Sequence, residues 1–107
     1  MKPSVPFEDY LIEKLKDADY AKVYLETALE EYGKDHNSDA FLLALKDIAR
    51  AQGGLGKLAK DANLNRAGIY RALGEGGNPR LDTLEKILRS LGFRLSVEQL
   101  RQEELVV

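Results

Sequence analysis

The sequence predicts a small all-α domain of five to six helices that is followed by a short C-terminal β-strand. Three observations favour this fold class. Apolar residues recur three and four positions apart in most segments, glycine or proline separates these segments, and residues 93–97 alternate apolar and polar side chains. With 107 residues, the chain has the length of one domain with a modest core, so we expect residues 1–107 to form a single domain.

The N-terminal part, residues 1–37, is expected to hold an arm and two helices. Pro3 and Pro6 favour an extended arm, and helical spacing predicts helices over 7–16 and 18–32. Gly33 is expected to end the longer helix, before a polar loop over 34–37. The residues expected to line one side of this helix are Tyr20, Val23, Tyr24, Ala28 and Leu29.

Residues 38–97 are expected to form a helical core that ends in the strand. Ser38 is a favourable N-cap for a helix over 39–52, which Gly53-Gly54 terminates. After a glycine-rich turn over 74–79, a last helix over 80–91 is expected to face inward with Leu81, Leu84, Ile87, Leu88 and Leu91. Gly92 ends that helix, and residues 98–107 form a tail whose position the sequence does not indicate.

The stretch from Leu58 to Leu73 has the pattern of two short helices joined by a tight turn. Ala59 is small, which allows a second helix to cross closely, and Asn63 tolerates the left-handed conformation that the turn needs. Asn65 is a favourable N-cap for the second helix. This pattern is typical of a helix-turn-helix, which places its second helix in the major groove of DNA. The alternative is a plain helical hairpin in a small bundle.

Two sets of residues are expected to contact DNA. The outer face of the second helix reaches base edges in this motif, and here it carries Arg66, Ala67, Tyr70 and Arg71. Phosphates are expected to be held by backbone N–H groups near helix starts and by neighbouring polar side chains, namely at Gly56, Lys57, Asn65, Asn78 and Arg80.

The charge of the chain is divided unevenly. The net charge is −2, but residues 51–94 carry 8 Lys and Arg against 4 Asp and Glu, a net of +4. Residues 1–50 carry a net of −4 and residues 95–107 a net of −2. Because salt screens distant charges, the basic block suits contact with phosphates, and the acidic N-terminal half suits a solvated face or a basic partner.

No constellation for catalysis or metal binding is found. The chain has no cysteine, and its single histidine, His36, lies in a polar loop. The glycines of 74–78 lack the spacing of a nucleotide-binding loop, although a small-ligand site there stays open as an alternative. We expect no cofactor, no metal and no membrane segment.

Phe93, Leu95 and Val97 are the apolar residues of the predicted strand. A single strand is not stable alone, because its backbone groups need a partner. The simplest partner is the same strand of a second copy, which predicts a homodimer.

Residues 41–97 resemble the helix-turn-helix of phage Cro and repressor proteins, and residues 7–97 resemble the bacterial addiction-module antidote proteins, or antitoxins. The resemblance is carried by residues 44–51, by Leu58-Ala59, by residues 64–66 and 69–73, and most specifically by residues 77–80, Thr83-Leu84 and residues 91–95. The residues at 9–11 and 24–25 also look like that family.

The resemblance implies an antitoxin of a type II toxin–antitoxin module in the bacterial cytoplasm, associated with the nucleoid. It would bind operator DNA as a dimeric autorepressor and neutralise a small basic ribonuclease toxin. With the acidic charge of residues 1–50, it suggests a toxin-binding surface formed by Glu8, Asp9, Tyr10, Leu11, Glu13, Asp17, Tyr20 and Tyr24. The alternative is a stand-alone phage-type transcriptional repressor without a toxin partner.

Overall fold

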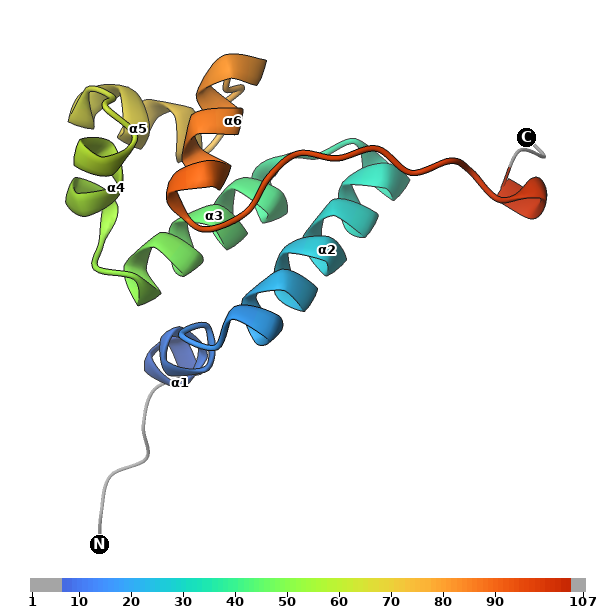
Figure 1. The fold of residues 1–107 in the computed structure, drawn as a ribbon, viewed down its shortest axis with the longest axis horizontal. Coiled ribbons are helices and arrows are strands. Elements are labelled where there is room, and N and C mark those ends of the chain that lie inside the picture. The colour runs from blue at the N-terminus through green and yellow to red at the C-terminus, as the bar shows by residue number, and fades with distance from the viewer. Residues whose placement is uncertain (1–6, 105–107) are drawn as a thin grey trace, which may run out of the picture.

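The computed structural model describes residues 7–104, which form six α-helices and a short 3₁₀ helix (Figure 1). In chain order these are α1 (Phe7–Lys14), α2 (Ala18–Asp35), α3 (Asp39–Ala51), α4 (Leu55–Asp61), α5 (Arg66–Leu73), α6 (Leu81–Ser90) and η1 (Gln102–Glu104). The all-helical prediction is therefore confirmed. Helix α3 is central, because it packs against α1, α2, α4 and α5.

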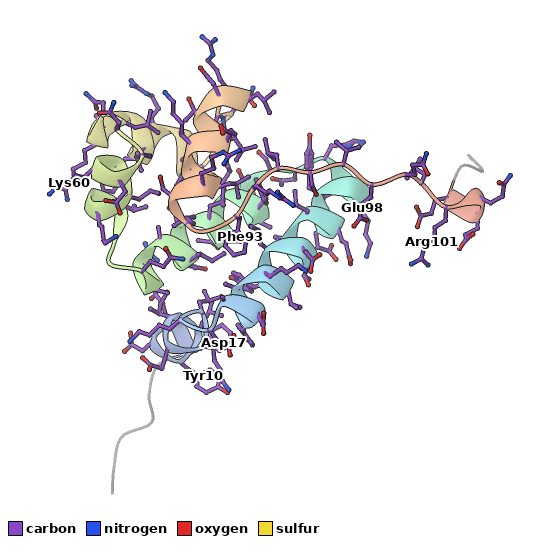
Figure 2. The ribbon with its side chains drawn as sticks, viewed as in Figure 1. Tyr10, Asp17, Lys60, Phe93, Glu98 and Arg101 are labelled. Atoms are coloured by element: carbon purple, nitrogen blue, oxygen red, sulfur yellow. The ribbon has the colours of Figure 1, made fainter. Side chains whose placement is uncertain are left out.

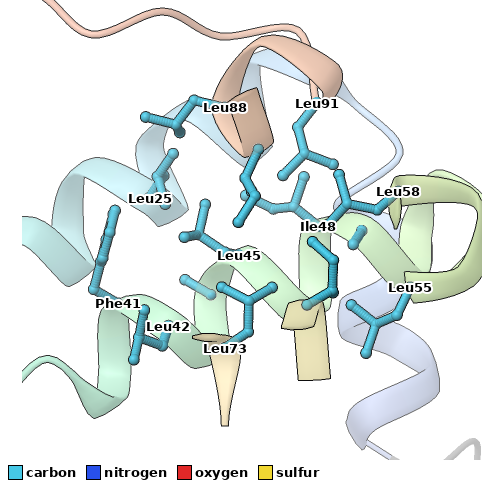
Figure 3. Close-up of a cluster of buried hydrophobic side chains, with 14 of the residues drawn as sticks. Leu25, Phe41, Leu42, Leu45, Ile48, Leu55, Leu58, Leu73, Leu88 and Leu91 are labelled. Carbon is cyan, nitrogen blue, oxygen red and sulfur yellow. The ribbon is translucent and has the colours of Figure 1, made fainter. Parts of the chain in front are cut away.

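One hydrophobic core joins all six helices. The side chains of Leu45, Ile48, Ile69 and Ile87 are fully buried, and they come from α3, α5 and α6. Figure 3 shows Leu45 and Ile48 among the neighbouring leucines of this core. The N-terminal helices contribute Ala21 and Leu25 of α2, and Leu15, which follows α1, is only 1% exposed. The N-terminal helices are thus part of the same core as the rest of the molecule.

Three of the helices end in the same way, with a left-handed residue that lets the chain turn. After α3, α4 and α6 this residue is Gly53 (φ 123°), Asn63 (φ 54°) and Gly92 (φ 97°). In each case the next residue donates its backbone N–H to a carbonyl five positions back, as Leu64 does to Ala59 at 2.8 Å. These are Schellman motifs, and they satisfy carbonyls that the helix end would leave free.

The predicted end of the second helix was wrong, whereas the predicted start of the third was right. Helix α2 does not end at Gly33 but continues to Asp35, because one exposed glycine costs only about 1 kcal/mol and the helix hydrogen bonds continue through it. The left-handed residue is His36 (φ 57°), whose N–H donates to the Tyr32 carbonyl. Helix α3 begins at Asp39 as predicted, with Ser38 in the N-cap position. The Ser38 side chain makes no cap hydrogen bond, and the Asn37 Oδ1 atom accepts from the Asp39 N–H at 2.9 Å.

Some of the apolar residues expected on one side of α2 or along α6 are exposed. Tyr20 and Val23 of α2 lie in solvent, and Leu29 is 49% exposed, because α3 covers the neighbouring stripe that holds Ala21 and Leu25. Leu81 is also exposed, since it begins α6 beyond the reach of the core.

The predicted C-terminal strand is not formed, so that prediction was wrong for the described chain. Residues 93–98 run extended across the C-terminal half of α2 and the start of α3 (Figure 1). A strand requires a ladder of hydrogen bonds with a neighbour, and residues 94–100 make no backbone hydrogen bond within residues 7–104. Phe93 packs against the core, whereas Leu95 and Val97 are exposed.

Candidate nucleic-acid interface

Helices α4 and α5 are joined by a tight turn at residues 62–65. The left-handed Asn63 reverses the chain, and the Asn65 side chain accepts a hydrogen bond from the Gly68 N–H at 3.1 Å, which caps α5. Ile69 and Leu73 bury one side of α5 against the core. The opposite side of α5 is therefore held rigidly toward solvent.

The four residues predicted to contact bases are all exposed on α5: Arg66, Ala67, Tyr70 and Arg71. Two of them touch each other. The Arg66 guanidinium lies 5.7 Å from the centre of the Tyr70 ring, and its Nη2 atom is 3.5 Å from the Tyr70 hydroxyl. Tyr70 is 49% exposed, so the pair presents both a flat ring and a forked donor to solvent.

Arg71 points to a different part of this surface. It lines a cleft of about 570 Å³ between α5 and the start of α6, together with Asn65, Asn78 and Arg80. The structure thus brings three of the predicted phosphate residues beside Arg71, whereas Gly56 and Lys57 lie at the start of α4. A Cβ atom placed on Gly56 would be 3.9 Å from the Arg66 guanidinium carbon, so the starts of α4 and α5 are adjacent.

The basic side chains around α4 and α5 are exposed, and two of them form surface ion pairs. Lys60 extends from α4 away from the body of the molecule (Figure 2). The Arg80 side chain is 86% exposed and lies 3.5 Å from the Asp82 carboxylate. Lys57 is held by Asp61 through an i,i+4 ion pair of 2.6 Å. Exposed pairs of this kind contribute about 0–1 kcal/mol, so a phosphate can compete for Lys57.

The glycines between α5 and α6 have structural reasons to be glycine. A Cβ atom on Gly77 would overlap the backbone carbonyl of Ala72, one on Gly74 would lie 2.8 Å from the Tyr70 carbonyl oxygen, and Gly76 has a φ of 73°. The Gly76 N–H donates to the Asp39 carboxylate at 3.3 Å, which ties this turn to α3. The turn's shape accounts for its composition without a bound nucleotide.

The predicted toxin-binding residues differ in their exposure and in their contacts. Asp9, Tyr10, Glu13 and Tyr20 are exposed, whereas Leu11 is half-buried against the core. Asp17 caps α2 by accepting hydrogen bonds from the N–H groups of Asp19 and Tyr20. Glu8 is exposed but pairs with Arg50 at 3.1 Å. Phe7 and Val23, which the sequence reasoning did not select, add exposed apolar area to α1 and α2.

A buried carboxylate anchors these helices to α3. Asp47 is 5% exposed, and it accepts hydrogen bonds from the Tyr24 hydroxyl at 3.0 Å and from Arg50 at 3.4 Å. Burial, followed by the hydrogen bond to Asp47 and the charges of Asp47 and Tyr20, raises the pKa of Tyr24 to about 12. No sequence signal identified Asp47, because one acidic residue on an amphipathic helix is normally solvated.

Residues 7–104 contain no cluster of three or more His, Cys, Asp or Glu side chains that could hold a metal ion. His36, the only histidine of the chain, packs edge-on against Tyr32 at the end of α2. Among the same residues, no helix is long and apolar enough to cross a membrane.

The comparisons with known proteins decide the family. The model of a family described as "Probable addiction module antidote protein" matches residues 7–99, which is most of the chain. The chain belongs to this family. It is also 35% identical over 96 residues to an uncharacterized protein of Haemophilus influenzae, and the match spans 85% of this chain and 98% of that protein. No solved structure matched.

Membership of the antidote family confirms the resemblance of residues 7–97 to addiction-module antidote proteins. It supports an antitoxin role and implies a toxin as the partner of the antidote.

Proposed function

We propose that this antidote protein is the antitoxin of a type II module, which represses its own operon through a Cro/repressor-type helix-turn-helix and neutralises a ribonuclease toxin. The observation that carries the DNA-binding half is the outward face of α5. Helix α5 is capped by Asn65, and its outward face exposes Arg66 and Tyr70. This face lies within residues 51–94, the only block of the sequence with a net positive charge.

The two kinds of DNA contact are proposed to come from different parts of this surface. Arg66 and Tyr70, together with Ala67, face outward from the N-terminal half of α5, where they meet base edges in a major groove. Asn65, Asn78 and Arg80 share the cleft beside α6 and hold phosphates, as do the backbone N–H groups near Gly56 and the Lys57 ammonium. Arg71 lies between both regions and reaches either a base or a phosphate.

A two-fold dimer would present two copies of α5 to successive major grooves, about 34–36 Å apart. Phe93, Leu95 and Val97 are proposed to form the dimer strand, since the backbone of residues 94–100 makes no hydrogen bond within the described chain.

The toxin is proposed to bind the exposed face of α1 and α2. Tyr10 and Tyr20 provide aromatic anchors, and Asp9, Glu13 and Glu8 provide an acidic rim. An acidic surface attracts a basic ribonuclease at low salt. The half-buried Leu11 and Tyr24 and the capping Asp17 support this surface from below.

Fluorescence anisotropy with DNA from upstream of the chain's own gene, and with a random duplex, tests DNA binding. Arg66→Ala should weaken operator binding by about 5- to 150-fold and spare the random duplex, because a bidentate base contact contributes about 1–3 kcal/mol of discrimination. Arg80→Ala should weaken both duplexes alike and lower the salt slope by about one. Lys16→Ala, an exposed lysine between α1 and α2, is the control. Equal losses on both duplexes for Arg66→Ala would contradict the assignment.

Co-purification with the product of the adjacent gene tests the toxin. Tyr10→Ala and Tyr20→Ala should weaken neutralisation and leave operator binding unchanged, and Tyr70→Ala should do the reverse. Deleting residues 1–32 is unsuitable, because Leu15, Ala21 and Leu25 belong to the core. A chain that binds DNA but captures no neighbouring protein would favour the second candidate, a stand-alone phage-type repressor.

A further inference from the structure

The cleft that is proposed to hold DNA phosphates has two walls that are held in different ways. One wall is α5, which lines the cleft with Gly68 and Arg71 and is packed on the core. The other wall is the turn between α5 and α6, residues 75–80, which carries Asn78 and Arg80. Because this turn is not part of a helix, it needs other contacts to keep these two side chains in place.

The composition of the turn does not fix its shape. Gly74, Gly76 and Gly77 lie within four residues, and glycine has more backbone freedom to lose than any other residue. Among the described residues, the backbone N–H groups of residues 75–78 make two hydrogen bonds. One is local, from Gly77 to the Gly74 carbonyl at 2.9 Å, and the other runs from Gly76 to the Asp39 carboxylate at 3.3 Å. The bond to Asp39 is the one that ties the turn to a different helix.

Asp39 is a firm anchor for this bond. It is the first residue of α3, its N–H donates to the Asn37 Oδ1 atom at 2.9 Å, and the nearby Phe41 and Leu42 are buried in the core. Within the described part of the chain, its carboxylate forms no ion pair, and it does not line the cleft. Because an acidic group near phosphates opposes DNA binding, the Asp39 carboxylate favours binding only through the turn that it holds.

We propose that Asp39 is a positioning residue for DNA binding, because its carboxylate holds the Gly76 N–H and so keeps Asn78 and Arg80 in place at the cleft. The inference rests on the proposed DNA-binding function and adds to it a residue that does not touch the DNA. Without this hydrogen bond the glycine-rich turn samples more conformations, and ordering them on binding lowers the affinity. The loss falls on phosphate contacts, which carry no sequence information, so all duplexes are affected alike.

Two substitutions at Asp39 in the full chain separate positioning from charge repulsion. Asp39→Ala removes both the charge and the acceptor, whereas Asp39→Asn removes the charge and keeps an acceptor oxygen. In fluorescence anisotropy, Asp39→Ala should weaken binding to operator and random duplexes by about two- to tenfold, the range that one hydrogen bond supports. Asp39→Asn should bind at least as tightly as the wild type. Asp19→Ala, which removes an exposed carboxylate from the first turn of α2, is the control and should leave binding unchanged.

Two further measurements test whether Asp39 acts through the turn. In the DNA-free protein, the Gly76 N–H should exchange its hydrogen faster in Asp39→Ala than in the wild type or Asp39→Asn. Circular dichroism should stay unchanged, because the Asp39 side chain is exposed. In a chain that already carries Asn78→Ala and Arg80→Ala, adding Asp39→Ala should not weaken DNA binding further.

The outcomes separate this inference from the function on which it rests. Tighter binding by Asp39→Ala and Asp39→Asn alike would show charge repulsion alone and would overturn the inference, while DNA binding would stand. An unchanged exchange rate at Gly76, or a loss that persists in the Asn78→Ala and Arg80→Ala chain, would overturn it in the same way. A wild-type chain that binds neither duplex would overturn the proposed DNA-binding function and the inference together.

Discussion

Removing the Tyr24 hydroxyl should destabilise the protein through its hydrogen bond to the buried carboxylate of Asp47. Tyr24→Phe keeps the half-buried ring but deletes a hydrogen bond of 3.0 Å to the Asp47 carboxylate. Hydrogen bonds to charged groups contribute about 1.5–3 kcal/mol to stability. Asp47 keeps Arg50 as a partner at 3.4 Å, so we expect a loss near the lower end, about 1.5 kcal/mol of unfolding free energy.

The pH dependence gives this prediction a second, independent signature. The Tyr24 pKa is raised from 10.0 to about 12 in the folded chain. The stabilisation is therefore fully present below pH 10 and is lost as the pH rises through about 12, because the unfolded chain releases the Tyr24 proton first. The difference in stability between wild type and Tyr24→Phe should then shrink across this range.

Urea unfolding at neutral and alkaline pH measures both effects. At neutral pH, Tyr20→Phe is the matched control, because Tyr20 is exposed and its hydroxyl makes no hydrogen bond within the described residues. A change below about 0.5 kcal/mol for Tyr24→Phe would refute the reasoning, since a made hydrogen bond contributes more than that. A stability difference between wild type and Tyr24→Phe that stays constant from pH 9 to about pH 12 would refute it as well.

Three further predictions follow from the backbone and the core. Asn65→Ala should lower the unfolding free energy by about 1 kcal/mol, because it removes the α5 cap, and urea unfolding should show it; no change would mean that the cap is not made. Gly77→Ala should lower the melting temperature, because its Cβ atom would overlap the Ala72 carbonyl. Gly33→Ala should raise the unfolding free energy by about 0.4–1 kcal/mol, since the helical Gly33 has open space around it. A Gly77→Ala variant that melts above Gly33→Ala in calorimetry would contradict both. Leu15→Ala should cost about 2–5 kcal/mol, because Leu15 is 1% exposed, and a smaller loss would show that the N-terminal helices do not share the core.

Local signals predicted most of the helical architecture. Apolar spacing located the helices, Asn63 indicated a left-handed turn and Asn65 a cap, because these features depend on residues within about one helical turn of each other. The outer face of α5 followed from the same spacing, since Ile69 and Leu73 fix which side is buried. The family could also be read from these residues and from the turn between α5 and α6.

Only the tertiary structure decided the features that depend on partners distant in the sequence. Spacing alone could not tell that α3 covers Ala21 and Leu25 rather than Tyr20 and Val23, because both stripes of α2 are apolar. Nor could it tell that Asp47 is buried, since Tyr24 and Arg50 must come close for that carboxylate to leave water. The alternation of apolar and polar side chains at 93–97 is typical of a strand. A strand also needs a second backbone to pair with, and residues 7–104 of one chain do not provide it.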